Sequence, residues 1–176
     1  DFCLSRGLGD VYKRQEGPLH SQIQADIRRR GLASICNMQG EVAPQDVITL
    51  LAISDIFLYS GTRGTNFSMA VLEAMAAGCA VIASVTPQSN GALLADGRGI
   101  PIEPGSSAAI SDALVRLCGD LALCRQMGQM ARGYVSDHHN AEALKRSLLR
   151  ASYFTPTLVE ENVEITVSVS RVEQRA

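Results

Sequence analysis

The residues best suited to chemistry lie between Ser60 and Ser84, where a polar loop precedes an apolar helix that contains one acid, Glu73. The loop is rich in glycine and hydroxyl side chains, and residues 69–77 are strong helix formers. The first backbone N–H groups of a helix that follows such a loop bind phosphate and other anions. A carboxylate that faces a polar cleft accepts hydrogen bonds from hydroxyl groups, as a sugar or a ribose offers. The stretch therefore predicts recognition of phosphate and hydroxyl groups.

Glu73 also has a plainer interpretation, because most glutamates on helices are simply solvated. Its neighbours argue against that interpretation, since Val71, Leu72 and Met75 leave the helix little polar surface. A carboxylate in such surroundings is expected to face a cleft or a fixed partner. We therefore favour a binding role for Glu73.

Short apolar segments on both sides must position the loop and the helix. A strand over 55–59 leads into the loop, and another strand follows the helix over 80–84. Asn66 or Ser68 is placed to cap the start of the helix, and Gly78 is placed to end it. Open α/β sheets bind phosphates where a helix begins at the carboxyl end of a buried strand. The pattern predicts an α/β fold with a parallel sheet.

The other segments continue the alternation of strands and helices. The expected elements are a helix from Leu19 that ends at the exposed arginines 28–30, a strand over 34–39, a helix opened by Pro44, a short helix over 91–95 capped by Ser89 or Asn90, an edge strand over 99–102, and helices after Pro104. In the helix opened by Pro44, we expect the apolar side chains to be buried, namely Val47, Ile48, Leu50, Leu51 and Ile53.

Composition excludes several classes of protein. A net charge of −2 gives no electrostatic reason to expect nucleic acid as a partner. The five cysteines are scattered without a Cys-x-x-Cys pair, which indicates reduced thiols in a cytoplasmic protein. The adjacent His138 and His139 cannot chelate one metal from one helix face, so we interpret them as a solvated junction and expect no metal site.

The motifs of the central stretch resemble those of a known family. Residues 72–78 (Leu-Glu-Ala-Met-Ala-Ala-Gly) and 80–84 (Ala-Val-Ile-Ala-Ser) are similar to the core of the retaining GT-B glycosyltransferases of group 1, which use nucleotide-diphosphate sugars. The resemblance continues through 94–99 and Pro104-Gly105, reaches back to 17–19, and covers about 16–151. It implies a Rossmann-like parallel sheet flanked by helices, the C-terminal half of a GT-B fold, with its first strand or strands lost before Glu16 and with a helical C-terminal tail.

The resemblance also implies a donor site. Nine residues would bind the nucleotide-diphosphate sugar, which is the substrate, with no further cofactor: Gly40, Glu41, Val42, Gly64, Asn66, Phe67, Ser68, Met69 and Glu73. Glu73 corresponds to the acid that binds ribose, and the loop after 34–39 borders the nucleobase. Ser89 and Asn90 lie on a further loop near the donor and are second-rank candidates.

One departure from the family pattern concerns the acid beside the transferred sugar. The family carries it eight residues before the glutamate that matches Glu73, and this count gives Thr65 here. Counting forward from Ser60 gives Arg63 instead, so neither alignment supplies a carboxylate and the catalytic residue is left unassigned. The alternative function is therefore a non-catalytic GT-B-like binding or assembly module that has lost this acid.

The chain is expected to have three parts. Residues 1–15 resemble a translated sequencing adaptor and are interpreted as a non-native leader, 16–153 as a truncated donor-binding domain, and 154–176 as a flexible tail that contains an alternating strand pattern. The parent enzyme is expected to be a hexosyltransferase with an N-terminal acceptor domain. Its expected location is the cytoplasm, and peripheral attachment to the inner face of the membrane is left open. The basic pair that stabilises the leaving phosphate in the family would lie before Glu16, so we expect no turnover by this chain alone.

Overall fold

The computed structural model describes residues 2–5, 11–14, 19–40, 42–61, 68–86 and 89–144. The chain divides into two units, Asp1–Asn140 and Ala141–Ala176. The sheet and the helices that cover it belong to the first unit. The pattern predicted over 160–172 lies outside the described residues.

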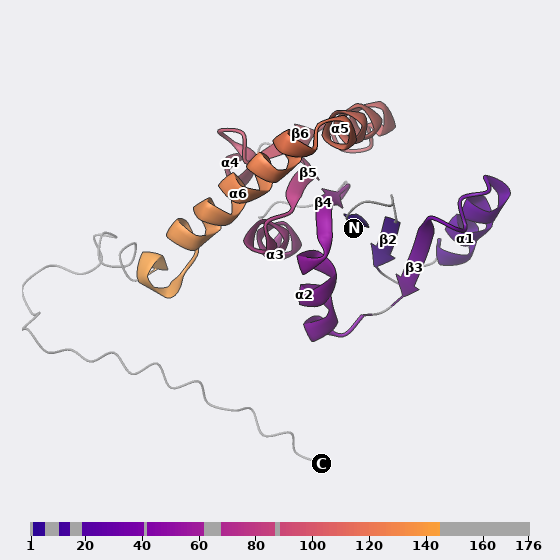
Figure 1. The fold of residues 1–176 in the computed structure, drawn as a ribbon, viewed down its shortest axis with the longest axis horizontal. Coiled ribbons are helices and arrows are strands. Elements are labelled where there is room, and N and C mark those ends of the chain that lie inside the picture. Colours follow the sequence, from indigo (N-terminus) through magenta and orange to yellow (C-terminus); the bar gives the residue numbers. More distant parts are fainter. Residues whose placement is uncertain are drawn as a thin grey trace, which may run out of the picture. The chain divides into compact units, whose positions relative to one another are not determined.

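A six-stranded sheet forms the centre of this unit, in the order β3-β2-β1-β4-β5-β6. The strands are β1 (Phe2–Ser5), β2 (Val11–Arg14), β3 (Cys36–Gly40), β4 (Ser54–Tyr59), β5 (Ala80–Ser84) and β6 (Gly99–Ile102). Strands β4, β5 and β6 are parallel, as are β2 and β3. Strand β1 runs antiparallel to both β2 and β4 and so separates two parallel blocks. The predicted Rossmann-like α/β class is confirmed, and Figure 1 shows its elements in chain order.

Two of these strands were not predicted, because residues 1–15 were left out of the fold. The structure pairs Val11 with Cys36 in parallel and Phe2 with Leu58 in antiparallel register. The sheet is therefore wider than the sequence suggested, and it is not purely parallel. The position of β6 at the end of the sheet explains how it accommodates Pro101, since an edge strand needs fewer backbone donors.

Helices cover the sheet on both faces, and the alternation of side chains along β4 and β5 shows how. Phe57 and Val81 belong to one core cluster, which takes residues from α2 (Pro44–Ala52), α3 (Met69–Ala77) and α4 (Gly91–Leu94). Leu58 and Ile82 belong to the other cluster, which takes residues from α5 (Ser107–Gly119) and the first half of α6 (Leu121–His138). Further along, Ala131 of α6 joins the first cluster. Each buried strand thus contributes to two cores, as strands covered on both faces do.

Local sequence explains most helix ends. Pro44 occupies the first turn of α2, as predicted, and Gly78 ends α3 in the left-handed conformation with φ 86°. Ser106 and Asp120 cap α5 and α6 by accepting hydrogen bonds from backbone N–H groups three residues on. The helix α1 (His20–Arg29) contains no buried residue, although Ile23 and Ile27, which lie four residues apart on one face, are half-buried.

Part of the predicted burial of α2 is wrong. Val47 and Leu51 are buried, but Ile48 is 69% exposed and Ile53 is 47% exposed. The two buried residues lie four apart, on one face of the helix, and that face alone packs on the core.

Within the described residues, none of the helices combines the length and apolar character that crossing a membrane requires.

Candidate functional site

The predicted site begins where β4 ends and α3 starts. Ser60 and Gly61 follow β4, and Ser68 is the N-cap residue of α3 in extended conformation. The hydroxyl of Ser68 makes no capping hydrogen bond to the helix. The backbone N–H groups of Val71 and Leu72 donate to the carbonyl of Ser68 at 3.1 and 3.2 Å, so the helix start depends on this residue's backbone rather than on its side chain. The other candidates on this loop lie outside the described residues, namely Arg63, Gly64, Thr65, Asn66 and Phe67.

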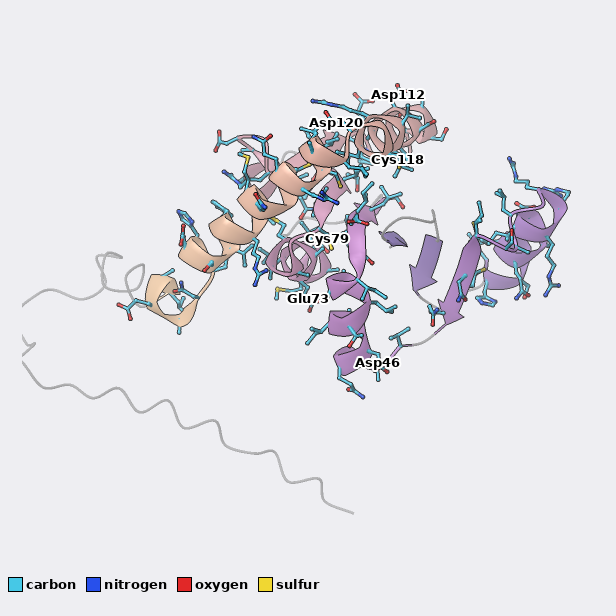
Figure 2. All side chains as sticks on the ribbon, viewed as in Figure 1. Asp46, Glu73, Cys79, Asp112, Cys118 and Asp120 are labelled. Carbon is cyan, nitrogen blue, oxygen red and sulfur yellow. The ribbon has the colours of Figure 1, made fainter. Side chains whose placement is uncertain are left out.

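Glu73 lies on the solvent-exposed face of α3. Met69, one turn earlier, is 66% exposed, and Ala76 continues the same exposed stripe. The opposite face, with Val71, Ala74 and Met75, is fully buried. Figure 2 shows Glu73 on the side of α3 away from α6. The carboxylate is therefore exposed to solvent, and no described residue forms an ion pair with it, so a fixed partner of this kind, one of the two surroundings expected from the sequence, is not found among the described residues.

The loop after β3 reaches the same core as α3. Gly40 is the last residue of β3, and Val42 is half-buried against the cluster that contains Val71 and Met75. Glu41 lies outside the described residues. The structure thus brings one predicted nucleobase-side residue, Val42, to the sheet face that carries α3.

The most highly connected polar residue of this region is Asn90, which precedes α4. Asn90 is 1% exposed; its Oδ1 accepts a hydrogen bond from the backbone N–H of Ser68 at 3.0 Å, and its Nδ2 donates to the carbonyl of Ser84 at 3.3 Å. Ser84, 3% exposed, donates from its hydroxyl to the carbonyl of Gly61 at 2.6 Å. Ser89, by contrast, accepts from the N–H of Thr86 at 2.7 Å and stays within its own loop.

Sequence reasoning found Asn90 as a loop candidate and missed the role of Ser84. Asn90 does occupy the N-cap position of α4, but its side chain does not cap that helix. The available signal for Ser84 was a hydroxyl at the end of an apolar strand, which is a weak one because serine ends many strands. Its partner Gly61 is also covered by Tyr59, since a Cβ on Gly61 would come within 2.6 Å of the Tyr59 hydroxyl.

Arg98 accounts for the turn that follows α4. Its guanidinium donates to the carbonyls of Ala92 and Leu93, at 2.8 and 2.9 Å, and to Asp96 at 2.9 Å. The same group lies 3.9 Å from the centre of the Tyr134 ring. Asp96 itself has φ 54° in the turn that it forms with Gly97. Arg98 therefore serves the fold by holding the end of α4.

The histidines and cysteines offer little for chemistry. His138 stacks on Tyr134 with ring centroids 4.5 Å apart, and His139 lies 5.5 Å from the same ring. Burial, with lesser contributions from the charges of Asp55 and Cys118, raises the pKa of Cys124 to about 11. This thiol is therefore protonated at neutral pH and a poor nucleophile. In the described part of the chain, no three His, Cys, Asp or Glu residues are grouped to hold a metal ion.

Comparison with known proteins identifies the family to which the chain belongs. The family model described as "Glycosyl transferases group 1" matches residues 8–134. An uncharacterized glycosyltransferase of Methanocaldococcus jannaschii is 25% identical over 101 residues, which are 57% of this chain and 26% of that protein. The chain thus spans about a quarter of the length of this relative.

Solved structures show the same fold. HepE of Anabaena, crystallised with UDP, superposes with a TM-score of 0.68 at 19% identity, over 78% of this chain and 39% of HepE. The C-terminal domain of LpcC, a group 1 glycosyl transferase family protein of Francisella tularensis, superposes with a TM-score of 0.61 at 26% identity, over 69% of this chain and 62% of that domain. This chain therefore belongs to the group 1 glycosyl transferases and has the fold of their C-terminal GT-B domain.

Proposed function

We propose that this domain binds the nucleotide-diphosphate sugar of a glycosyltransferase that transfers a hexosyl group with retention. Family membership supports this proposal, and HepE, which has the same fold, was crystallised with UDP and with UDP-glucose. The complete enzyme would add an acceptor-binding domain on the N-terminal side. Such a domain would hold the acceptor hydroxyl against the sugar as the bond to the diphosphate breaks.

The observation that carries the proposal is the placement of Glu73 on α3. The helix begins after the carboxyl end of β4, and Glu73 lies one turn from its first residue on an exposed face. The partial positive charge at the helix start favours the diphosphate. The exposed carboxylate of Glu73 accepts hydrogen bonds from the ribose hydroxyls. One short helix thus offers partners for both the anionic and the neutral polar parts of a nucleotide.

The remaining candidate residues would have roles in the same donor site. Gly40, Glu41 and Val42 border the nucleobase, while Ser68 and Met69 belong to the start of α3. Gly64, Asn66 and Phe67 complete the loop before the helix, and either Arg63 or Thr65 takes the place beside the transferred sugar. A positive charge from Arg63 would stabilise the leaving phosphate.

The test is calorimetric titration of the chain with UDP and with GDP. Saturable binding of either nucleotide supports the proposal, and Glu73→Gln should weaken it by about 1–3 kcal/mol, roughly 5- to 150-fold in Kd, because the neutral amide is a weaker acceptor. Asp112→Asn on α5 is the matched control, since Asp112 is also an exposed acid on a helix. A folded chain that binds neither nucleotide would instead favour the non-catalytic module.

A further inference from the structure

A buried polar connection joins the two ends of the segment 62–67. Gly61 precedes this segment and Ser68 follows it, and neither belongs to a strand or a helix. Ser84 binds the carbonyl of Gly61 through its hydroxyl, and Asn90 binds the N–H of Ser68 through its amide oxygen. The amide nitrogen of Asn90 closes the connection on the carbonyl of Ser84.

The geometry of this connection leaves little freedom. A backbone N–H must face the amide oxygen of Asn90 and a carbonyl must face its amide nitrogen, so the two partners fix the orientation of the amide. Ser84 is the last residue of β5, and its neighbour Ala83 pairs with Tyr59 at the end of β4. The connection therefore lies at the carboxyl ends of two adjacent parallel strands. Because Ser84 and Asn90 are almost fully buried, water does not compete for these hydrogen bonds.

We propose that Ser84 and Asn90 are positioning residues for the donor site, which hold both ends of the segment 62–67 and thereby fix the first turn of α3. The proposal rests on the proposed function, because the group to be positioned is the start of α3 that receives the diphosphate. Asn90 acts through the backbone of Ser68 and does not itself touch the donor. This distinguishes Asn90 from Glu73, whose side chain is exposed on α3.

The alternative is that the pair only stabilises the core. That role would affect all of α3 alike, whereas a positioning role acts on Ser68 selectively. The amide hydrogen exchange of Ser68 separates the two, because Asn90 is the acceptor of that N–H. The amides of Ala74 and Met75, which lie in the buried part of α3, serve as internal references.

The experiment measures amide exchange by NMR in the original 176-residue chain and in four variants. Asn90→Leu removes both hydrogen bonds at similar volume and should speed exchange at Ser68 about tenfold or more, with Ala74 and Met75 unchanged. Asn90→Asp keeps an oxygen acceptor and should preserve much of the protection. Ser89→Ala removes a hydroxyl that accepts from Thr86 within its own loop, and it should leave Ser68 unchanged. Exchange at Ser68 that is unaffected by Asn90→Leu in a folded protein would overturn the proposal.

Ser84→Ala is the fourth variant, and it removes a single hydroxyl, so it remains informative should Asn90→Leu not fold. It should speed tryptic cleavage after Arg63, because Gly61 is released, and equal cleavage in the variant and the original chain would overturn the role of Ser84. UDP titration then separates this inference from the proposed function. Loss of Ser68 protection in a chain that binds neither UDP nor GDP leaves the hydrogen-bond connection standing and rejects donor binding. Unchanged UDP affinity in Asn90→Leu, with binding present, rejects the positioning role.

Discussion

Gly128 of α6 lies directly against the carbonyl group of Gly78, the residue that ends α3. A side chain at residue 128 would collide with this backbone, and no flexible group is there to move aside. The absence of a Cβ therefore lets α6 approach the end of the helix that carries Glu73. The left-handed conformation of Gly78 ends α3, and the chain continues through Cys79 into β5.

Gly128→Ala should lower the free energy of unfolding by about 2–4 kcal/mol, because α6 must move away from α3. Urea unfolding followed by circular dichroism measures the change. Gly133→Ala on the same helix is the matched control, since a Cβ there meets nothing within 4 Å. The control should be neutral or more stable by up to about 1 kcal/mol, because alanine is the better helix former. Equal effects of the two substitutions would contradict the close contact at residue 128.

Cys124 should react with iodoacetamide far more slowly than Cys118. Cys124 is buried and its pKa is raised to about 11, so roughly 0.1% of it is thiolate at pH 8, whereas Cys118 is exposed. Peptide mass spectrometry after timed alkylation should give rates that differ by about 100-fold or more in the folded protein. The difference should vanish in urea. Similar rates in the folded protein would show that Cys124 is not protected.

The same pKa shift has a consequence for stability at alkaline pH. The folded state holds the Cys124 proton more tightly than the unfolded state does, because the folded pKa is raised. The resulting stabilisation is complete below the ordinary thiol pKa and is lost as the pH rises toward about 11. The unfolding free energy should therefore fall more steeply over this range in the original chain than in Cys124→Ala.

Arg98→Lys should destabilise the fold by about 1–2 kcal/mol, because lysine cannot reach both carbonyls of α4 and also cover the Tyr134 ring. Asp96→Asn removes only the ion pair, and Asp96 is 82% exposed, so this control should cost less than about 0.5 kcal/mol. Asparagine also tolerates the positive φ of this turn. Thermal unfolding of both variants compares them. A larger effect of Asp96→Asn would mean that the ion pair is the principal contact.

The sequence was sufficient to predict β4, α3 and β5, because the local signals agree in these three elements. Strands β4 and β5 are short apolar runs, α3 consists of strong helix formers, and Gly78 marks its end. The exposure of Ile48 and Ile53 was not predicted, because α2 is apolar on several sides and only tertiary contacts select the buried one. Strand β1 was not predicted for a related reason, since its pairing partners lie far along the chain.

The candidate site was predictable only in its parts. The helical pattern placed Glu73 on α3 and singled it out as an acid among apolar residues, and the resemblance to the family added the ribose as its expected partner. The connection through Ser84 and Asn90 requires three segments to meet at the ends of β4 and β5, and no local pattern encodes such a meeting. Whether a polar residue in a loop faces a ligand or binds backbone depends on these neighbours.

Donor binding at the start of α3 is tested most directly by mapping UDP onto the chain through amide chemical shifts in NMR. Such binding should give saturable shifts at Ser68, Met69 and Val42, with none at Asp112 on α5, and a weaker response of the same amides in Glu73→Gln. Shifts centred on α5, or a folded chain whose amides do not respond to UDP and GDP at millimolar concentration, would contradict donor binding at the start of α3.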